Sequence, residues 1–174
     1  MKMKISEQLA AEINDQINKE FYSEYYYLSM AAYLESENLP GFGNFFVVQA
    51  QEEHFHAMKF YQYLNDRGAK VKLEAIAKPK SDFKSALEVF ELALEHEMYV
   101  SSRINNLMDI ALADNDHASK GFLQWYVDEQ VEEEANMEDY VNRLNRMGDH
   151  SYGILMLDKE LAARVFTPPV AAKQ

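Results

Sequence analysis

The helix-breaking residues of this 174-residue chain are few and clustered, and their positions constrain the fold more than any other feature. The four prolines and five of the six glycines lie in short stretches around positions 40, 68, 79, 148 to 153 and 168. The sequence between these stretches is rich in Glu, Ala, Leu, Met, Lys and Gln, which have high helix propensity. This pattern predicts an all-α chain of four long helices and one short one, at about 6–37, 41–67, 82–112, 116–147 and 153–164.

The connections between the long helices predict their directions. Two connections, at 38–40 and 113–115, are so short that the helices they join must be antiparallel neighbours. The connection at 68–81 has about 14 residues and can stretch to about 45 Å, whereas a helix of about 28 residues is about 42 Å long. It can therefore return along the whole bundle. We expect a four-helix bundle with one long crossover between helices two and three, followed by a short fifth helix.

The charge of the chain and its lack of cysteine limit the partners it can bind. Seventeen basic and 29 acidic residues give a formal net charge of −12, which repels nucleic-acid phosphates and anionic lipid and attracts cations. Without cysteine, a metal site must use carboxylate oxygen and imidazole nitrogen. The sequence has no stretch of roughly 20 apolar residues and no apolar region after the N-terminal charges. We expect a soluble cytoplasmic protein with no membrane or nucleic-acid partner.

Polar residues interrupt the apolar stripes of all four predicted long helices at the same depth. Residues seven apart lie almost in line on a helix, and each such column is apolar or aromatic except near its middle. The interruptions begin roughly 12–15 residues from the start of each helix, about 20 Å along its axis. Helices that run up and down agree in level only at their midpoints. We therefore expect one polar layer, formed by Glu20, Glu53, His56, Glu97, Gln130 and Glu133, with Gln49 beside it.

This layer would gather four glutamates where the stripes supply no Lys or Arg. Burial of even one unpaired carboxylate is costly, so either some of the acids are protonated, with raised pKa values, or cations occupy the layer. Two divalent ions would balance four carboxylates, with His56 and Gln130 as neutral ligands. The spacing of Glu53 and His56 puts both on one helix face, where Glu53 can bridge two ions. Such donors favour iron or manganese, although zinc can also bind.

Four parts of the chain carry a family resemblance: residues 20–23 (EFYS), residues 51–56 (QEEHFH), Glu97 and residues 124–134 (QWYVDEQVEEE). They resemble the prokaryotic non-haem ferritins of the ferritin-like di-iron superfamily. The resemblance extends over about residues 5–164, which predicts one domain at 1–165 and a C-terminal tail at 166–174. It implies an iron storage protein with ferroxidase activity, which oxidises Fe(II) with dioxygen or peroxide. The ferric mineral would be stored in a hollow shell of about 24 identical subunits.

The resemblance also implies roles for individual residues. The first iron would be bound by Glu20, Glu53 and His56. The second would be bound by Glu53, Glu97 and either Gln130 or Glu133. A third iron position is matched by Glu52, Glu129 and Glu132, together with Glu133. Tyr27 matches a tyrosine beside the centre that could hydrogen-bond a ligand or donate an electron, although the residues alone equally allow an aromatic packing role.

Two departures from other ferritin-like proteins refine the expected activity. The sequence Gln130-Val131-Glu132-Glu133 stands where di-iron oxidases and bacterioferritins repeat Glu-x-x-His. An amide in place of an anionic or imidazole ligand should weaken the second site and favour release of iron into a store. His54 stands where bacterioferritins have Met, so we expect no haem. Two alternatives remain open: a soluble di-iron oxidoreductase of the peroxidase type that forms no mineral, and a metal-free structural bundle.

Overall fold

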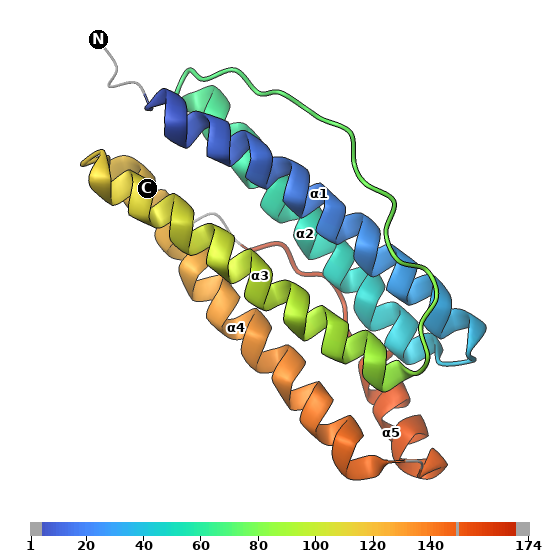
Figure 1. Cartoon of the computed structure of the whole chain (residues 1–174). Coiled ribbons are helices and arrows are strands. Elements are labelled where there is room, and N and C mark those ends of the chain that lie inside the picture. The colour runs from blue at the N-terminus through green and yellow to red at the C-terminus, as the bar shows by residue number, and fades with distance from the viewer. Residues whose placement is uncertain (1–4, 149, 170–174) are drawn as a thin grey trace.

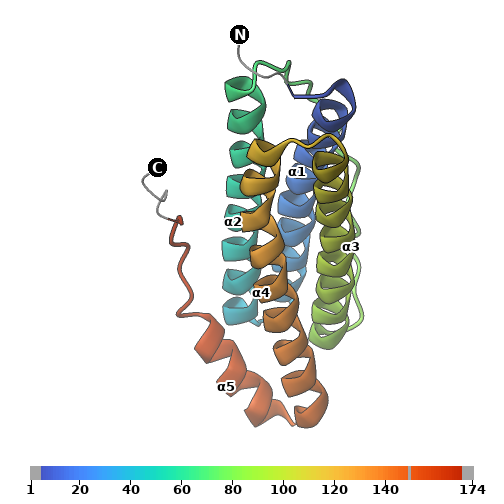
Figure 2. The ribbon, with the colours of Figure 1, turned by 90° about the vertical axis from the view of Figure 1, so that its left-hand side faces the viewer.

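The chain forms five helices in the predicted order, arranged as a bundle with a short final helix (Figure 1). The computed structural model describes residues 5–148 and 150–169, and this part of the chain contains no strand. The helices are α1 Glu7–Ser36, α2 Pro40–Asp66, α3 Ala86–Ala113, α4 His117–Met147 and α5 Ser151–Leu161. α1 to α4 lie side by side, and α5 lies obliquely at one end (Figure 2). The predicted all-α four-helix bundle with a short fifth helix is confirmed.

Local capping sets the helix boundaries, and α3 and α5 differ from their predicted ranges. α3 begins at Ala86 instead of near 82, because Ser85 caps it by accepting from the amide three residues ahead at 3.1 Å. Residues 82–85 therefore belong to the crossover. α5 begins at Ser151 and ends at Leu161, about one turn before the predicted end. Of the predicted C-terminal tail, residues 170–174 lie outside the described part of the chain.

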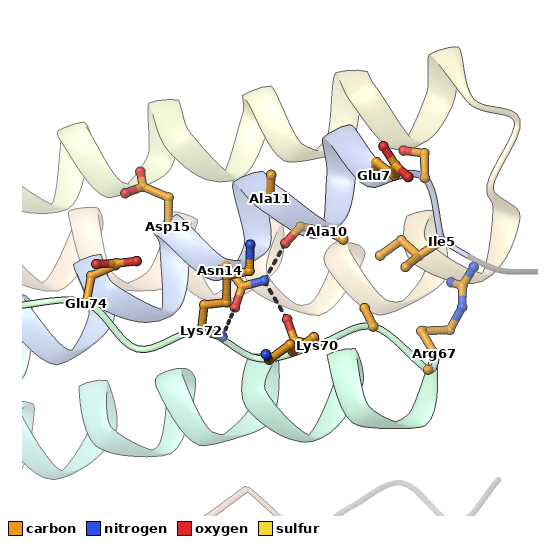
Figure 3. A pocket seen from close by; sticks show the side chains of 13 residues that line it. Ile5, Glu7, Ala10, Ala11, Asn14, Asp15, Arg67, Lys70, Lys72 and Glu74 are labelled. Carbon is orange, nitrogen blue, oxygen red and sulfur yellow. Dashed lines mark hydrogen bonds between the residues drawn. The ribbon is translucent and has the colours of Figure 1, made fainter.

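The crossover between α2 and α3 follows α1 for most of the length of the bundle (Figure 1). Asn14 holds its first part: the side-chain Nδ2 donates to the carbonyl of Lys70 at 3.1 Å, and Oδ1 accepts from the amide of Lys72 at 2.7 Å (Figure 3). Ser29, four turns further along α1, donates to the carbonyl of Lys80 at 2.7 Å. Side chains of α1 thus satisfy backbone groups that have no strand or helix partner, and they fix the path of the crossover.

α5 packs against the first turn of α2 at Gly41. A Cβ built on Gly41 would lie 1.7 Å from the carbonyl oxygen of Asp158, so only glycine allows this approach. The carboxylate of Asp158 accepts from the amide of Phe42 at 2.9 Å and so caps α2 from another helix. The final helix is therefore anchored to the bundle by specific contacts.

The apolar core consists of two clusters, one toward each end of the bundle. The cluster at the α5 end includes Phe46 and Phe90, and the cluster at the opposite end includes Ile13 and Phe60. Between them lies a layer of buried polar side chains. Among the described residues, no helix is both long enough and apolar enough to cross a membrane.

Candidate metal centre

The buried polar layer at mid-height contains all six side chains that interrupt the predicted stripes. Each of them is at most 5% exposed. α1 contributes one, α2 two, α3 one and α4 two: Glu20, Glu53, His56, Glu97, Gln130 and Glu133. Gln49 is also buried in this region. The layer falls into two halves that differ in their hydrogen bonding.

The first half-site, formed by Glu20, Glu53 and His56, has the geometry of a metal site. One donor atom of each residue lies within 4.8 Å of the donor atoms of the other two. Glu20 Oε2 and Glu53 Oε2 are buried, and neither has a hydrogen-bond partner within the described part of the chain. His56 Nδ1 lies 3.7 Å from Glu53 Oε2. Buried acceptors without partners are rare and costly, so these oxygens and the imidazole fit a bound cation.

Gln16 is a buried neighbour of this half-site that the sequence reasoning missed. Its Nε2 donates to Glu20 Oε1 at 2.9 Å, and its Oε1 accepts from Arg103 Nε at 3.1 Å. One oxygen of Glu20 is thereby held while the other stays unpaired. The available signal was a polar residue one helical turn before Glu20 on the same buried stripe.

The second half-site, formed by Glu97, Gln130 and Glu133, is already hydrogen-bonded by neutral donors. The hydroxyl of Tyr27 donates to Glu97 Oε1, and Gln130 Nε2 donates to Glu97 Oε2 at 3.1 Å. Gln49 Nε2 donates to Glu133 Oε2 at 2.9 Å. Tyr27 is therefore bonded to one of the proposed ligands. A metal ion in this half would have to share or replace these hydrogen bonds.

Burial dominates the electrostatics of the whole layer. Burial raises the pKa of Glu20 to about 7 and the pKa values of Glu53 and Glu133 well above their ordinary value, and the nearby Glu97 raises the last two further. Burial lowers the pKa of His56 to about 3, so its imidazole is neutral and has a lone pair for a metal. A divalent cation would lower the carboxylate pKa values, because it stabilises their charged form.

Comparison with known proteins assigns this arrangement to a family. The ferritin-like domain family matches residues 10–147. A bacterial non-heme ferritin of Staphylococcus aureus (strain USA300) is 46% identical over 162 residues, which are 93% of this chain and 98% of that protein. The chain belongs to the ferritin-like family. A ferritin of Staphylococcus saprophyticus is also 46% identical, over 93% of this chain and 97% of that protein.

Solved structures support the assignment of this chain to the ferritin family. An open pore ferritin from the archaeon Archaeoglobus fulgidus superposes with a TM-score of 0.92 and 48% identity, covering 93% of this chain and 100% of that chain. A humanized archaeal ferritin gives a TM-score of 0.94 and 48% identity, covering 95% of this chain and all of that chain. The fold and the family therefore agree by sequence and by structure.

In this ferritin, aromatic side chains of α4 pack against His56 of the first half-site. The ring centre of Trp125 lies 5.4 Å from that of His56, and the hydroxyl of Tyr126 donates to the carbonyl of His56 at 2.8 Å. Lys59 Nζ lies 4.0 Å from the ring centre of Trp125. Packing against these rings restricts the orientation of the imidazole.

The three other acidic residues of the resemblance lie outside the layer, on α2 and α4. Glu52 and Glu129 are half-buried, and Glu132 is exposed. Burial raises the pKa of Glu52, and the nearby charges of Glu129 and Glu132 add to this effect. The carboxylate of Glu52 is paired with Arg164, whose Nη2 lies 2.7 Å from Glu52 Oε2. No helical periodicity in the sequence marks Arg164, because it follows α5.

Proposed function

We propose that this ferritin binds Fe(II) as its substrate in the buried polar layer, oxidises it with dioxygen or peroxide, and stores the ferric product as a mineral. The observation that carries the proposal is the first half-site, where donors from Glu20, Glu53 and His56 already lie within 4.8 Å of one another. Two unpaired carboxylate oxygens are part of this half-site. Relatives described as bacterial non-heme ferritins support the same conclusion.

The donor set suits a pair of iron ions. The first Fe(II) would be held by Glu20, Glu53 and His56. The second would be held by Glu53, Glu97 and either Gln130 or Glu133. Two divalent ions neutralise the four buried carboxylates, whose charged forms are disfavoured without a cation. Each Fe(II) gives one electron to dioxygen, which takes up two protons and becomes hydrogen peroxide.

The charge balance after oxidation favours departure of the product. Two ferric ions carry more positive charge than the four carboxylates neutralise, so the ions gain hydroxide or oxide as they leave. In the second half-site, Gln130 supplies an amide in place of a charged ligand, and Glu97 and Glu133 have neutral donors ready to re-form hydrogen bonds. We expect this half to release iron readily, with a third position at Glu52, Glu129, Glu132 and Glu133.

The proposed store requires a shell of identical chains, and α5 offers a surface for assembly. Three apolar side chains at helical spacing remain exposed on it: Tyr152 at 77%, Leu155 at 58% and Met156 at 51%. Contiguous exposed apolar side chains favour contact with another protein surface. We infer a shell of 24 subunits in which α5 helices of neighbouring chains meet around a four-fold axis, as in the family.

Sedimentation combined with Fe(II) addition in air tests the proposal. We expect a particle of 24 chains that turns amber and takes up far more than two irons per chain. A monomer or dimer that saturates at two irons would instead favour a soluble di-iron oxidoreductase of the peroxidase type. A chain that neither binds nor oxidises iron would overturn the proposal.

A further inference from the structure

The segment that follows α5, residues 162–169, runs beside α2 (Figure 2) and contacts it through Arg164 and Phe166; it is named the strap. Asn44 on α2 ties its start to the bundle, because the side-chain Nδ2 donates to the carbonyl of Arg164 at 2.9 Å. Side chains then alternate in exposure: Arg164 and Phe166 are half-buried, whereas Val165 between them is 75% exposed. This alternation is typical of an extended chain with one side turned to the protein.

Arg164 makes three contacts with α2 from this position. Its Nη2 lies 2.7 Å from Glu52 Oε2, its Nη1 donates to the carbonyl of Phe45 at 3.5 Å, and its Cζ lies 4.4 Å from the ring centre of Phe45. Further along the strap, the ring centre of Phe166 lies 6.5 Å from that of Phe55. Stacking on an aromatic ring together with a charged hydrogen bond suits a guanidinium particularly well.

The carboxylate that Arg164 holds belongs to the acidic face beside the polar layer. Glu52 directly precedes Glu53 of the first half-site. Burial raises the pKa of Glu52, the charge of Arg164 lowers it, and the charge of Glu129 on α4 raises it again. The charge of Arg164 also reaches into the layer, where it opposes the burial that raises the pKa of Glu133. The guanidinium of Arg164 therefore occupies the position beside Glu52 that a metal ion bound to this carboxylate would take.

We propose that Arg164 is a built-in cation that competes with metal ions for Glu52, so that the strap must lift from α2 before a metal binds at Glu52, Glu129 and Glu132. This inference rests on the proposed function, in which iron leaving the layer reaches that face. A carboxylate oxygen held by a guanidinium cannot ligate a metal with the same lone pair. A metal ion beside an unmoved Arg164 would also experience repulsion between two cations.

Calorimetric titration of the metal-free assembled protein with Zn²⁺ tests the competition. We expect the affinities of the first two Zn²⁺ ions per chain to differ much less between the wild type and Arg164→Gln than the affinity of the third, because Arg164 touches Glu52 directly and acts on Glu133 only through its charge. The third should bind roughly three- to tenfold more tightly in Arg164→Gln. Arg146→Gln removes the same charge from an exposed position in the last turn of α4 and should match the wild type. Glu52→Gln should weaken or abolish the third event. Equal third affinities in Arg164→Gln and the wild type would overturn the proposal.

A spin label on the strap tests whether it lifts. The chain contains no cysteine, so Val165→Cys gives a single labelling site at a position that is 75% exposed. We expect the nitroxide spectrum to narrow when the third Zn²⁺ binds and to change little during the first two. In Arg164→Gln the spectrum should be narrow before any metal is added. A spectrum that stays broad while the third Zn²⁺ binds would overturn the proposal.

The same titrations separate this inference from the proposed function. If the first two Zn²⁺ ions bind and the third event does not depend on Arg164, only the strap inference is overturned. If no third event occurs in any variant, the third position is overturned with it, and the two-metal centre stands. If no variant binds the first two ions, the metal centre itself is wrong, and both proposals are overturned.

Discussion

The two halves of the polar layer contain similar side chains and differ in what holds them. In the first half, Glu20 Oε2 and Glu53 Oε2 have no hydrogen-bond partner in the described part of the chain. In the second half, neutral groups donate hydrogen bonds to the carboxylates: Tyr27 and Gln130 donate to Glu97, and Gln49 donates to Glu133. Unpaired buried carboxylate oxygens, rather than the number of carboxylates, thus distinguish the first half from the second, where the buried atom without a partner in the described chain is the amide Oε1 of Gln49.

This difference predicts unequal metal binding. A cation in the first half relieves a desolvation penalty that the protein relieves only in part, through the Gln16 hydrogen bond and the charge of Arg103 on Glu20. A cation in the second half must displace hydrogen bonds that already stabilise the charges, so its net gain is smaller. We therefore expect the first half to fill before the second, and the experiments below test the two halves separately.

Glu53→Gln should have the largest effect, because Glu53 supplies an unpaired oxygen and is the one residue proposed as a ligand of both irons. We expect the initial rate of Fe(II) oxidation in air to fall by about 100-fold or more. The metal-free fold should be retained or stabilised by about 1–3 kcal/mol, since a carboxyl group whose charged form is disfavoured by burial is replaced by a neutral amide. Absorbance of the ferric product and thermal unfolding of the metal-free protein measure the two effects.

Glu91→Gln is the matched control, because it makes the same chemical change at an exposed position of α3. It should leave both the oxidation rate and the unfolding temperature unchanged. A metal-free structural bundle predicts a different outcome for Glu53→Gln: a gain in stability with no iron oxidation to lose. Unchanged rapid oxidation in Glu53→Gln would contradict the proposed centre.

The stability of the metal-free protein should fall as the pH rises through about 7. The pKa of Glu20 is raised from 4.5 to about 7 by burial, so the folded state binds a proton that the unfolded state releases. Stability from this group is fully present below pH 4.5 and is lost as the pH rises, by roughly 3 kcal/mol in all. The low pKa of His56 has the opposite sign, with stability lost only as the pH falls below 6.5 toward 3.

Metal binding should reverse this pH dependence. Metal ligation needs deprotonated carboxylates, so stability with saturating Zn²⁺ should rise between pH 6 and 7.5 while that of the metal-free protein falls. Denaturant unfolding at a series of pH values with and without Zn²⁺ gives both curves. Parallel curves would show that the carboxylates with raised pKa values are not the metal ligands.

The sequence predicts the polar layer well because its members share one period and one depth. Glu20, Glu53 and Glu97 each interrupt an apolar column near the middle of a long helix, and helix geometry alone then brings them to one level. Arg164 has no such pattern, because it follows the last helix and reaches Glu52 through an extended segment. The start of α3 was missed for a related reason, since the cap at Ser85 is a local hydrogen bond rather than a periodic signal.

Which neutral donors would satisfy which carboxylates also lay beyond the sequence. Gln16 and Gln49 are both glutamines on buried stripes, and their side chains could face either neighbour. Only the packed bundle shows that Gln16 donates to Glu20 and that Gln49 reaches across to Glu133. The unequal halves are thus a product of tertiary packing.

Gln130→Glu should make the second half bind metal more tightly, with a moderate effect. The substitution replaces a donor to Glu97 by a fifth acidic side chain of the layer, so the second half loses a hydrogen bond and gains an ionisable group. We expect metal affinity of the second site to rise about tenfold and metal-free stability to fall by about 1–3 kcal/mol. Zn²⁺ calorimetry and thermal unfolding measure both. Lower retention of metal than in the wild type would contradict the idea that the amide weakens this site.

Tyr27→Phe should give the smallest change in metal affinity, and it tests whether hydrogen bonding alone keeps the second half from binding a cation. Loss of the hydroxyl leaves Glu97 Oε1 without its donor, which makes it resemble Glu53 Oε2 in the first half. We expect the metal-free protein to lose about 1.5–3 kcal/mol and the second Zn²⁺ to bind a few-fold more tightly, because the metal now relieves an unpaired charge. Tyr126→Phe is the matched control: its hydroxyl donates to a backbone carbonyl, so its loss should cost about 1 kcal/mol and leave the second affinity unchanged. If the second Zn²⁺ instead binds more weakly in Tyr27→Phe, the hydroxyl of Tyr27 orients the Glu97 carboxylate toward the metal and does not compete with it. The two halves would then differ in how their ligands are positioned, not in whether their carboxylate oxygens are paired.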